Sequence, residues 1–264
     1  MPQKEKKTMA KIITISNQKG GVGKTTTAIN MSACIADRGR RVLVIDLDPQ
    51  GNATTGIGID KNQLSSNVYD VLLEGKSVAQ SVVKTSVKNL DILPCNNDLV
   101  GAEIPMSSMP NREFILKKAL AQVKDDYDYI FIDCPPSLGL LTLNALTACD
   151  GVIIPIQSEF FALEGLSQLV YTIKLVTKHT NPSLKVKGVV LTMFDGRSLM
   201  ARQVAGEIQK FFGTAVYSVP VPRNIKVTEA PSFGVPVNIH APRSSGAVAY
   251  QKIAEQFLSN EEDR

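Results

Sequence analysis

Residues 19–26 read Lys19-Gly20-Gly21-Val22-Gly23-Lys24-Thr25-Thr26. An apolar, β-branched run, Ile12-Ile13-Thr14-Ile15, precedes this glycine-rich stretch, and a helix-forming run from Thr26 to Asp37 follows it. Strand, glycine-rich turn and helix are the context of a phosphate-binding loop. Small residues let backbone N–H groups converge on phosphate oxygens, and the helix N-terminus adds partial positive charge at the same point. The stretch therefore predicts a site for a phosphate-bearing ligand.

The loop departs from the usual pattern in one respect. The pattern G-x-x-x-x-G-K-[ST] would place its first glycine at position 18, where this chain has Gln18. The match is to a variant, K-G-G-x-G-K-[ST]-[ST], with an extra lysine, Lys19. We expect Lys24 to reach the β- and γ-phosphates of a nucleotide and Thr25 to offer its hydroxyl to Mg²⁺. The alternative is a glycine-rich hairpin with a chance Gly-Lys-Thr, which the preceding strand and the second lysine disfavour.

Composition places the chain among ordinary globular proteins. Of its 264 residues 44% are hydrophobic and 20% charged, and no apolar run approaches the ~20 residues that a membrane span requires. Residues 1–10 are polar and basic and lack the apolar core of a signal peptide, so we expect a disordered tail there and a cytoplasmic protein. None of the four cysteines has metal-site spacing, and buried free thiols are the expectation for them.

Strand-like and helix-like segments alternate along the chain, which predicts an α/β fold: a doubly wound, mostly parallel sheet with helices on both faces. We expect strands over 11–16, 41–45, 90–93, 127–133, 151–156, 187–194 and 216–221. We expect helices over 25–38, 68–73, 111–124, 138–148, 162–179, 199–212 and 244–258, and a loop over 46–58. The economical division is one P-loop domain over 11–258 with an acidic tail over 259–264.

Four polar segments, 17–24, 46–52, 133–137 and 195–197, directly follow predicted strands. Because ligands bind outside the carboxyl ends of parallel strands, all four should meet at one edge of the sheet. Asp133 ends an apolar run, as does a Walker B carboxylate that holds Mg²⁺. Asp46 and Asp48 are one residue apart after another strand and should lie on one side. The alternatives are a polar cap for Asp133 and a solvated loop pair for Asp46 and Asp48.

The variant loop and several later motifs resemble the deviant Walker A ATPases, and among these the ParA/Soj group of chromosome and plasmid partition proteins. The motifs that carry the resemblance are spread over nearly the whole chain: Lys19 to Thr26, Asp46 to Asn52, Ile132 to Ser137, Glu164-Gly165-Leu166, Pro222-Arg223-Asn224 and Glu229-Ala230-Pro231-Ser232. The resemblance implies an ATPase that hydrolyses ATP to ADP and phosphate with Mg²⁺, and that forms a homodimer when ATP is bound.

The resemblance also implies roles for single residues. Asp48 matches the aspartate that positions the attacking water, and Asp46 supports the metal site. Lys19 matches the lysine that crosses a two-fold interface to the partner's nucleotide, although spacing alone also allows a surface charge. The segment Pro222-Arg223-Asn224 matches a contact to the adenine base. Glu164 matches a ribose or interface contact, and a solvated acid in the first turn of a helix is an equal alternative.

The segment from 185 to 226 is rich in basic residues. Between positions 185 and 226 seven basic residues face two acids, a surplus of five positive charges in a chain of net charge +4. Such a surface suits sequence-independent contact with DNA phosphates, and by resemblance Arg197, Lys226 and Arg243 are our candidates. Solvated surface charge is the alternative.

The resemblance further implies a ParB-type partner that stimulates hydrolysis, and association with the nucleoid in the ATP-bound state. A replication initiator is a possible further partner. Three other functions are alternatives. A MinD-like membrane-positioning ATPase needs a basic amphipathic C-terminal helix, whereas residues 259–264 are acidic. An iron–sulfur reductase of the nitrogenase iron-protein type needs cysteines in glycine-rich turns, which this chain lacks. A nucleotide-sensing regulator of replication or transcription stays open.

Overall fold

The computed structural model describes residues 9–159 and 162–262, except for the side chains of 162–164. Its centre is a seven-stranded sheet in the order β3-β4-β2-β5-β1-β6-β7. All neighbouring strands run parallel except the short edge pair β3–β4. The strands are β1 (Lys11–Ile15), β2 (Val42–Asp46), β3 (Val83–Lys84), β4 (Leu90–Leu93), β5 (Tyr129–Asp133), β6 (Gly151–Gln157) and β7 (Lys185–Thr192). The expected doubly wound fold is confirmed.

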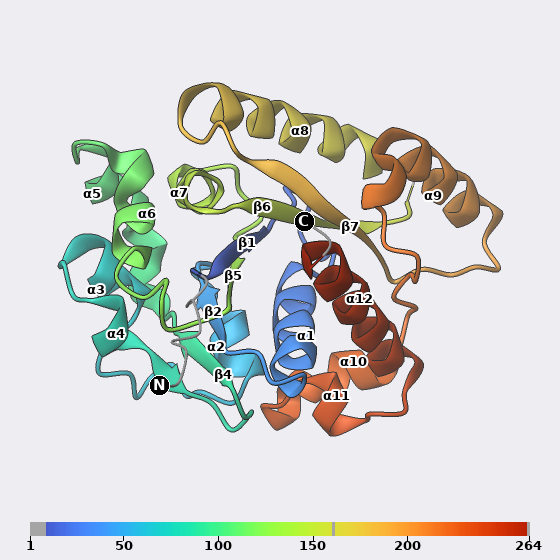
Figure 1. Cartoon of the computed structure of the whole chain (residues 1–264), viewed down its shortest axis with the longest axis horizontal. Helices are drawn as coiled ribbons and strands as arrows, with labels where there is room; N and C mark the ends of the chain where they lie inside the picture. Colours follow the sequence, from blue (N-terminus) through green and yellow to red (C-terminus); the bar gives the residue numbers. More distant parts are fainter. Residues whose placement is uncertain (1–8, 160–161, 263–264) are drawn as a thin grey trace, which may run out of the picture.

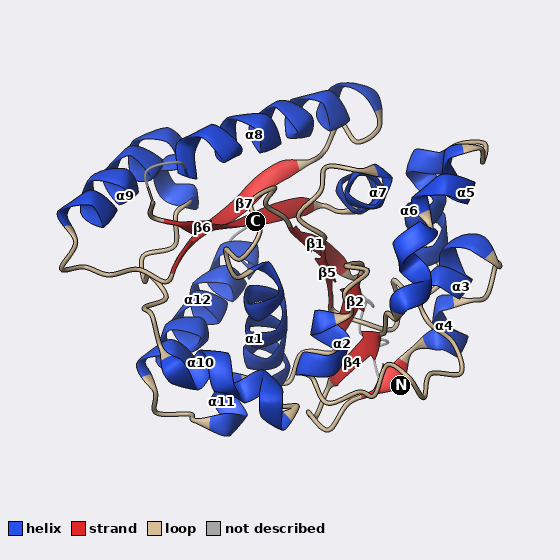
Figure 2. Cartoon of the chain, turned by 180° about the vertical axis from the view of Figure 1, so that it is seen from behind, coloured by secondary structure: helices blue, strands red, loops and turns tan. Residues whose placement is uncertain are grey.

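Helices cover both faces of this sheet (Figures 1 and 2). The helices before β5 are α1 (Lys24–Asp37), α2 (Asn52–Gly56), α3 (Val68–Leu73), α4 (Val78–Ser81), α5 (Glu103–Ser107) and α6 (Ile115–Leu120). Those after it are α7 (Leu140–Ala148), α8 (Ala162–His179), α9 (Leu199–Phe212), α10 (Ile225–Glu229), α11 (Val237–His240) and α12 (Ser245–Glu262). Four 3₁₀ turns complete the elements: η1 (Asn97–Gly101), η2 (Arg112–Phe114), η3 (Gly213–Ala215) and η4 (Ala230–Phe233).

Alternating strand residues supply two separate cores. Ile12 and Ile130 belong to the core beneath α3, α6, α7 and α8, whereas their neighbours Ile13 and Phe131 belong to the core beneath α1 and α12. Full burial of such a side chain stabilises the fold by about 1.5–3 kcal/mol. Because both faces are buried, the central strands read as continuous apolar runs, which is why the sequence indicated them clearly.

The last helix packs against the first. The Thr27 hydroxyl and the Tyr250 hydroxyl lie 3.3 Å apart, and Arg38 donates to the backbone carbonyl of Gln251. Helix α12 extends to Glu262, so residues 259–262, expected in the acidic tail, are helical. Glu261 forms a buried ion pair with Lys187 of β7, and this tertiary contact fixes the end of the helix. Residues 1–8, expected to be disordered, and 263–264 lie outside the described residues.

Several sequence expectations were wrong in detail. Residues 216–221 form no strand. Val216 makes an isolated bridge with Val189, and the next bridge, Phe194 with Pro222, lies just beyond the segment, because prolines at 220 and 222 cannot donate to a ladder. The expected loop 46–58 contains α2. The expected helix 111–124 is the turn η2 followed by the shorter α6, since Asn111 has φ 53° and starts a new segment. Ala10, placed in the tail, is buried and donates to the Lys124 carbonyl.

Candidate functional site

The glycine-rich loop leaves the middle of the sheet, because β1 lies between β5 and β6. Neighbouring strands hold it on two sides. Asn17 donates from Nδ2 to the Pro155 carbonyl of β6 (2.7 Å), and its Oδ1 accepts from the Lys19 amide (3.0 Å). At the other side the Thr192 hydroxyl of β7 donates to the Val22 carbonyl (2.8 Å). The loop is thus positioned by Asn17, which follows β1, and by Thr192 of β7.

The loop backbone leaves space for a ligand. Gly23 directly precedes α1 with φ 85°, a left-handed conformation that glycine adopts without strain. A Cβ on Gly20 or Gly21 would meet no described heavy atom within 4 Å. This open space in front of the helix N-terminus fits an anion such as a phosphate group.

The two lysines of the loop have different surroundings. Lys24 is 7% exposed, and its Nζ donates to the Lys19 carbonyl (3.1 Å). Burial lowers the pKa of Lys24, while the negative charges of Asp133 and Asp48 oppose that shift. Lys19 instead places its Nζ 2.6 Å from Glu159 Oε2, with 37% of its side chain exposed. One lysine therefore lies among the carboxylates of the site and the other lies at the surface.

The carboxylates gather at the carboxyl ends of β2 and β5, where Asp46 is in register with Asp133. Asp46 accepts from the Thr54 amide (2.8 Å) and hydroxyl (2.7 Å), and from the Asp48 amide (3.3 Å). Burial raises the pKa of Asp46 to about 6. Asp46 thus fastens α2 to the end of β2, and this use of its oxygens was not apparent from the sequence. Asp48 is 8% exposed and accepts from the Gln50 amide (3.0 Å).

Asp133 differs from Asp46 because both of its oxygens are buried and neither accepts a hydrogen bond of ordinary geometry from a described residue, with the Thr25 hydroxyl the nearest side-chain donor. Burial and the nearby charge of Asp46 raise the pKa of Asp133 well above its usual range, and the Thr25 hydroxyl opposes this shift. Unpaired buried carboxylate oxygens are costly, and a hard cation such as Mg²⁺ would satisfy them.

The residues present therefore fit Mg²⁺, provided that water and phosphate complete its coordination. Among residues 9–159 and 162–262 no group of three or more His, Cys, Asp or Glu is arranged to hold a metal ion alone. That agrees with the preference of Mg²⁺ for few protein ligands and several waters.

A cavity of about 640 Å³ opens beside the loop. Its wall includes Gly20, Lys24, Thr25 and Asp48 from the strand ends described above, together with Pro222, Arg223 and Asn224 from a distant part of the sequence. The size lies within the range of small-molecule sites. Asn224 is partly engaged already: its Oδ1 accepts from the Lys226 amide and caps α10, and its Nδ2 donates to the Ser245 hydroxyl. The Glu164 side chain lies outside the described residues.

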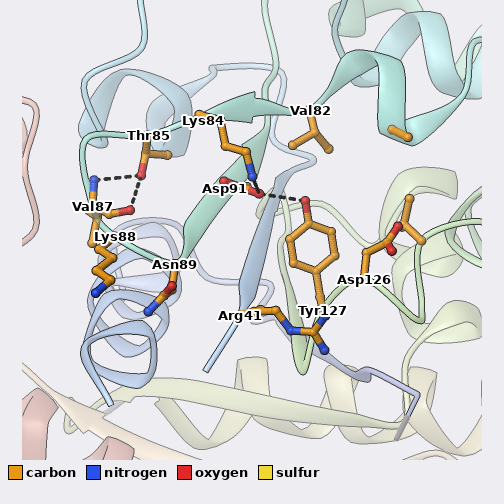
Figure 3. A pocket seen from close by; sticks show the side chains of 12 residues that line it. Arg41, Val82, Lys84, Thr85, Val87, Lys88, Asn89, Asp91, Asp126 and Tyr127 are labelled. Carbon is orange, nitrogen blue, oxygen red and sulfur yellow. Dashed lines mark hydrogen bonds and ion pairs between the residues drawn. The ribbon is translucent and has the colours of Figure 1, made fainter. Parts of the chain in front are cut away.

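A second cavity, of about 600 Å³, lies at the opposite edge of the sheet (Figure 3). Arg41, Asn89 and Tyr127 line it, and each precedes a parallel strand, which places the cavity at the amino ends. Its buried carboxylate is satisfied within the chain, since Asp91 Oδ2 accepts from Lys84 (2.7 Å) and from the Tyr127 hydroxyl (2.9 Å). Asp91 is therefore paired within the chain, unlike Asp133 beside the glycine-rich loop.

The candidate DNA-binding residues Arg197, Lys226 and Arg243 are all exposed. The bridge between Phe194 and Pro222 brings the segments that lead to Arg197 and Lys226 side by side. The basic surface is smaller than the sequence indicated, however. Lys187 is buried against Glu261, and Lys210 and Lys226 are paired with acids of their own helices, Glu207 and Glu229.

Sequence reasoning missed four positioning residues: Asn17, Thr54, Glu159 and Thr192. Each is an ordinary polar residue whose partner lies in another segment, so no local pattern identifies it. The nearest signal is position, because Asn17, Glu159 and Thr192 lie at or just beyond strand ends. The four cysteines are free and buried, as expected.

No helix in the described part of the chain is long and apolar enough to cross a bilayer. Residues 10–186 match a family described as an AAA domain. The chain is 52% identical to the sporulation initiation inhibitor protein Soj of Bacillus subtilis, over 96% of this chain and 100% of Soj. It is 48% identical to the chromosome partitioning protein ParA of Myxococcus xanthus, over 96% and 90%.

A solved structure is also similar. Cobyrinic acid a,c-diamide synthase from Mycobacterium smegmatis, with a bound ATP analogue and magnesium, superposes with a TM-score of 0.85 at 38% identity, covering 96% of each chain.

Proposed function

This chain belongs to the ParA/Soj family of chromosome-partitioning ATPases, and from that premise we propose that it is an ATP-operated dimerisation switch on DNA. ATP with Mg²⁺ closes two protomers into a homodimer, the dimer binds DNA without sequence preference, and hydrolysis releases it. A ParB-type protein is the partner that stimulates hydrolysis. The main support for the proposal is that the two lysines of residues 19–26 lie in different places. Lys24 is buried in the site, whereas Lys19 lies at its surface.

The nucleotide would lie in the cavity beside the loop. Its phosphates would occupy the space in front of Gly20 and Gly21, with Lys24 exchanging the Lys19 carbonyl for the β- and γ-phosphates. The base would lie against Pro222 and Arg223. Thr25 and Asp133 would hold Mg²⁺, which supplies neutralisation of phosphate charge when bound. Asp46, held by Thr54, would support this site from behind.

Hydrolysis needs an oriented water and stabilised charge more than covalent participation by the protein. Asp48 lies on the cavity wall with one oxygen fixed by the Gln50 amide, so it is suited to orient the attacking water. Lys19 would neutralise the phosphates of the partner's nucleotide, as an arginine finger does in trans. ATP binding would then stabilise the dimer directly.

The DNA contact is proposed for the exposed residues Arg197, Lys226 and Arg243. Segments leading to the first two leave the same edge of the sheet, and exposed cations suit contact with phosphates that carries no sequence information. Lys226 would exchange its ion pair with Glu229 for a DNA phosphate. Membrane attachment through α12 itself is disfavoured, because Glu261 and Glu262 at the end of this helix form ion pairs with Lys187 and Arg40.

Two variants test the switch by molar mass in light scattering with Mg²⁺ and ATP. Asp48→Ala keeps the loop, Thr25 and Lys19, so it should bind ATP, form a stable dimer and fail to hydrolyse. Lys19→Ala should bind ATP as a monomer. If both variants stay monomeric, Asp48 belongs to the binding site instead of the hydrolytic step. If Lys19→Ala dimerises normally, the lysine does not act across an interface.

A further inference from the structure

The ion pair between Lys19 and Glu159 joins two loops at neighbouring strand ends. Lys19 follows β1 and Glu159 follows β6, and these strands are paired in the sheet. Their charged atoms are 2.6 Å apart, although the two side chains are 37% and 46% exposed. Among the described residues Glu159 is the one acid within salt-bridge distance of Lys19.

Both loops are held in place independently of this ion pair. Asn17 links the Lys19 amide to the Pro155 carbonyl of β6, and the Glu159 amide donates to the Gln157 carbonyl (2.8 Å). The backbones that carry the two charges are therefore fixed relative to each other. Removing the Glu159 charge should leave the loop in place and free only the lysine side chain.

We propose that Glu159 is a positioning residue that holds Lys19 within its own protomer and so opposes ATP-dependent dimerisation. This inference rests on the proposed crossing role of Lys19. An ammonium group neutralised by a carboxylate contributes little to a phosphate of another protomer, so the ion pair must open before Lys19 can act there. The phosphates of the partner's ATP carry more negative charge than one carboxylate, so they can compete for the lysine once a second nucleotide-bound protomer is present.

The size of the effect follows from the number of ion pairs that open. A surface ion pair changes an equilibrium by about 2- to 5-fold. Each dimer opens two of them, one per protomer, so the effect on the dimer dissociation constant is the square of that factor. Glu159→Gln should therefore tighten the dimer by about 4- to 25-fold. High salt, which screens exposed pairs, should reduce the difference between variant and wild type.

The test is sedimentation equilibrium of the full chain with Mg²⁺ and the non-hydrolysable ATP analogue AMPPNP. Glu207→Gln is the matched control, since it removes an acid from another exposed ion pair, with Lys210 at 2.7 Å, far along α9. Glu159→Gln should dimerise more tightly, Glu207→Gln should match the wild type, and Glu159→Asp, which keeps the charge, should stay within about twofold of it. The double variant Lys19→Ala/Glu159→Gln should be monomeric.

The outcomes separate this inference from the function on which it rests. If the wild type dimerises through Lys19 but Glu159→Gln binds no more tightly, or more weakly, the inference is wrong and the switch stands. The same conclusion follows if Glu159→Asp tightens the dimer as much as Glu159→Gln. A double variant that dimerises would instead refute the crossing role of Lys19, and the inference with it. If neither wild type nor Glu159→Gln dimerises with nucleotide, the proposed function itself is wrong.

Discussion

Replacing Lys24 with alanine should weaken nucleotide binding by an amount that the structure allows us to bound. The ammonium group is buried beside Asp48 and Asp133 and donates to one neutral acceptor, the Lys19 carbonyl. Two charge-assisted hydrogen bonds to phosphate oxygens stabilise the complex by about 3–6 kcal/mol, and the lost neutral bond offsets about 1 kcal/mol. The net loss of about 2–5 kcal/mol corresponds to a 30- to 4,000-fold higher dissociation constant.

Isothermal titration calorimetry with AMPPNP and Mg²⁺ measures this change. We expect the upper half of the range, because removing Lys24 also leaves the buried carboxylates less compensated where the phosphates must lie. Lys61→Ala is the control: it removes an exposed lysine that donates to the Gln50 carbonyl near the site, and it should change the affinity by less than about threefold. A Lys24→Ala protein that is folded and binds AMPPNP within threefold of the wild type would refute the assignment of this loop.

Three further predictions concern the remaining charges. Asp133→Asn should stabilise the nucleotide-free protein by about 1–2 kcal/mol at pH 8 in urea unfolding while abolishing Mg²⁺-dependent ATP binding. Because the pKa of Asp133 is raised in the folded protein, ionisation of Asp133 lowers the stability of the wild type as pH rises above about 4, the pKa of an aspartate in the unfolded chain. The difference in unfolding free energy between Asp133→Asn and the wild type should therefore shrink toward acid pH. A difference that does not change with pH would contradict this reasoning. Glu261→Ala should lower the free energy of unfolding by about 3 kcal/mol because it leaves Lys187 buried and unpaired. Glu262→Ala, which removes an exposed ion pair, should lower the same free energy, measured by urea unfolding, by under about 1 kcal/mol. Equal losses would show that burial does not make the Lys187–Glu261 pair more important than the exposed one. Arg197→Glu and Lys226→Glu should each lower the salt dependence of DNA binding by about one unit of slope in fluorescence titrations with the ATP-bound dimer intact, and unchanged slopes would place the DNA elsewhere.

The sequence predicted the parts of the site that depend on strand ends. The pattern indicates the loop 19–26 and Asp133 because a parallel sheet brings the residues after its strands to one edge, and the structure places them there. Local composition also predicted the central strands, whose burial on both faces leaves a run of apolar residues. These features depend on short-range pattern and general topology, which a single sequence contains.

Contacts between distant segments could not be predicted in this way. Thr54 reaches Asp46 because α2 folds back over β2, in a stretch whose Gly, Asn and Thr residues indicated a loop. Glu159 and Lys19 are 140 positions apart, and nothing in the sequence around either residue indicates that they form a pair. The expected strand over 216–221 failed for a related reason: β-branched residues suggested a strand, but the prolines at 220 and 222 cannot donate the hydrogen bonds that a ladder needs.

The packing of α12 against α1 has a consequence for biosynthesis. The strand β1 is made first, yet both of its neighbours in the sheet, β5 and β6, are made more than a hundred residues later. The core beneath α1, the helix that follows the phosphate-binding loop, is completed even later, because it includes Tyr250 and Phe257 of α12. Contacts so distant in sequence form slowly and late. A nascent chain on the ribosome therefore lacks a finished nucleotide site until α12 has emerged, and we expect chains that end before α12 to bind ATP poorly.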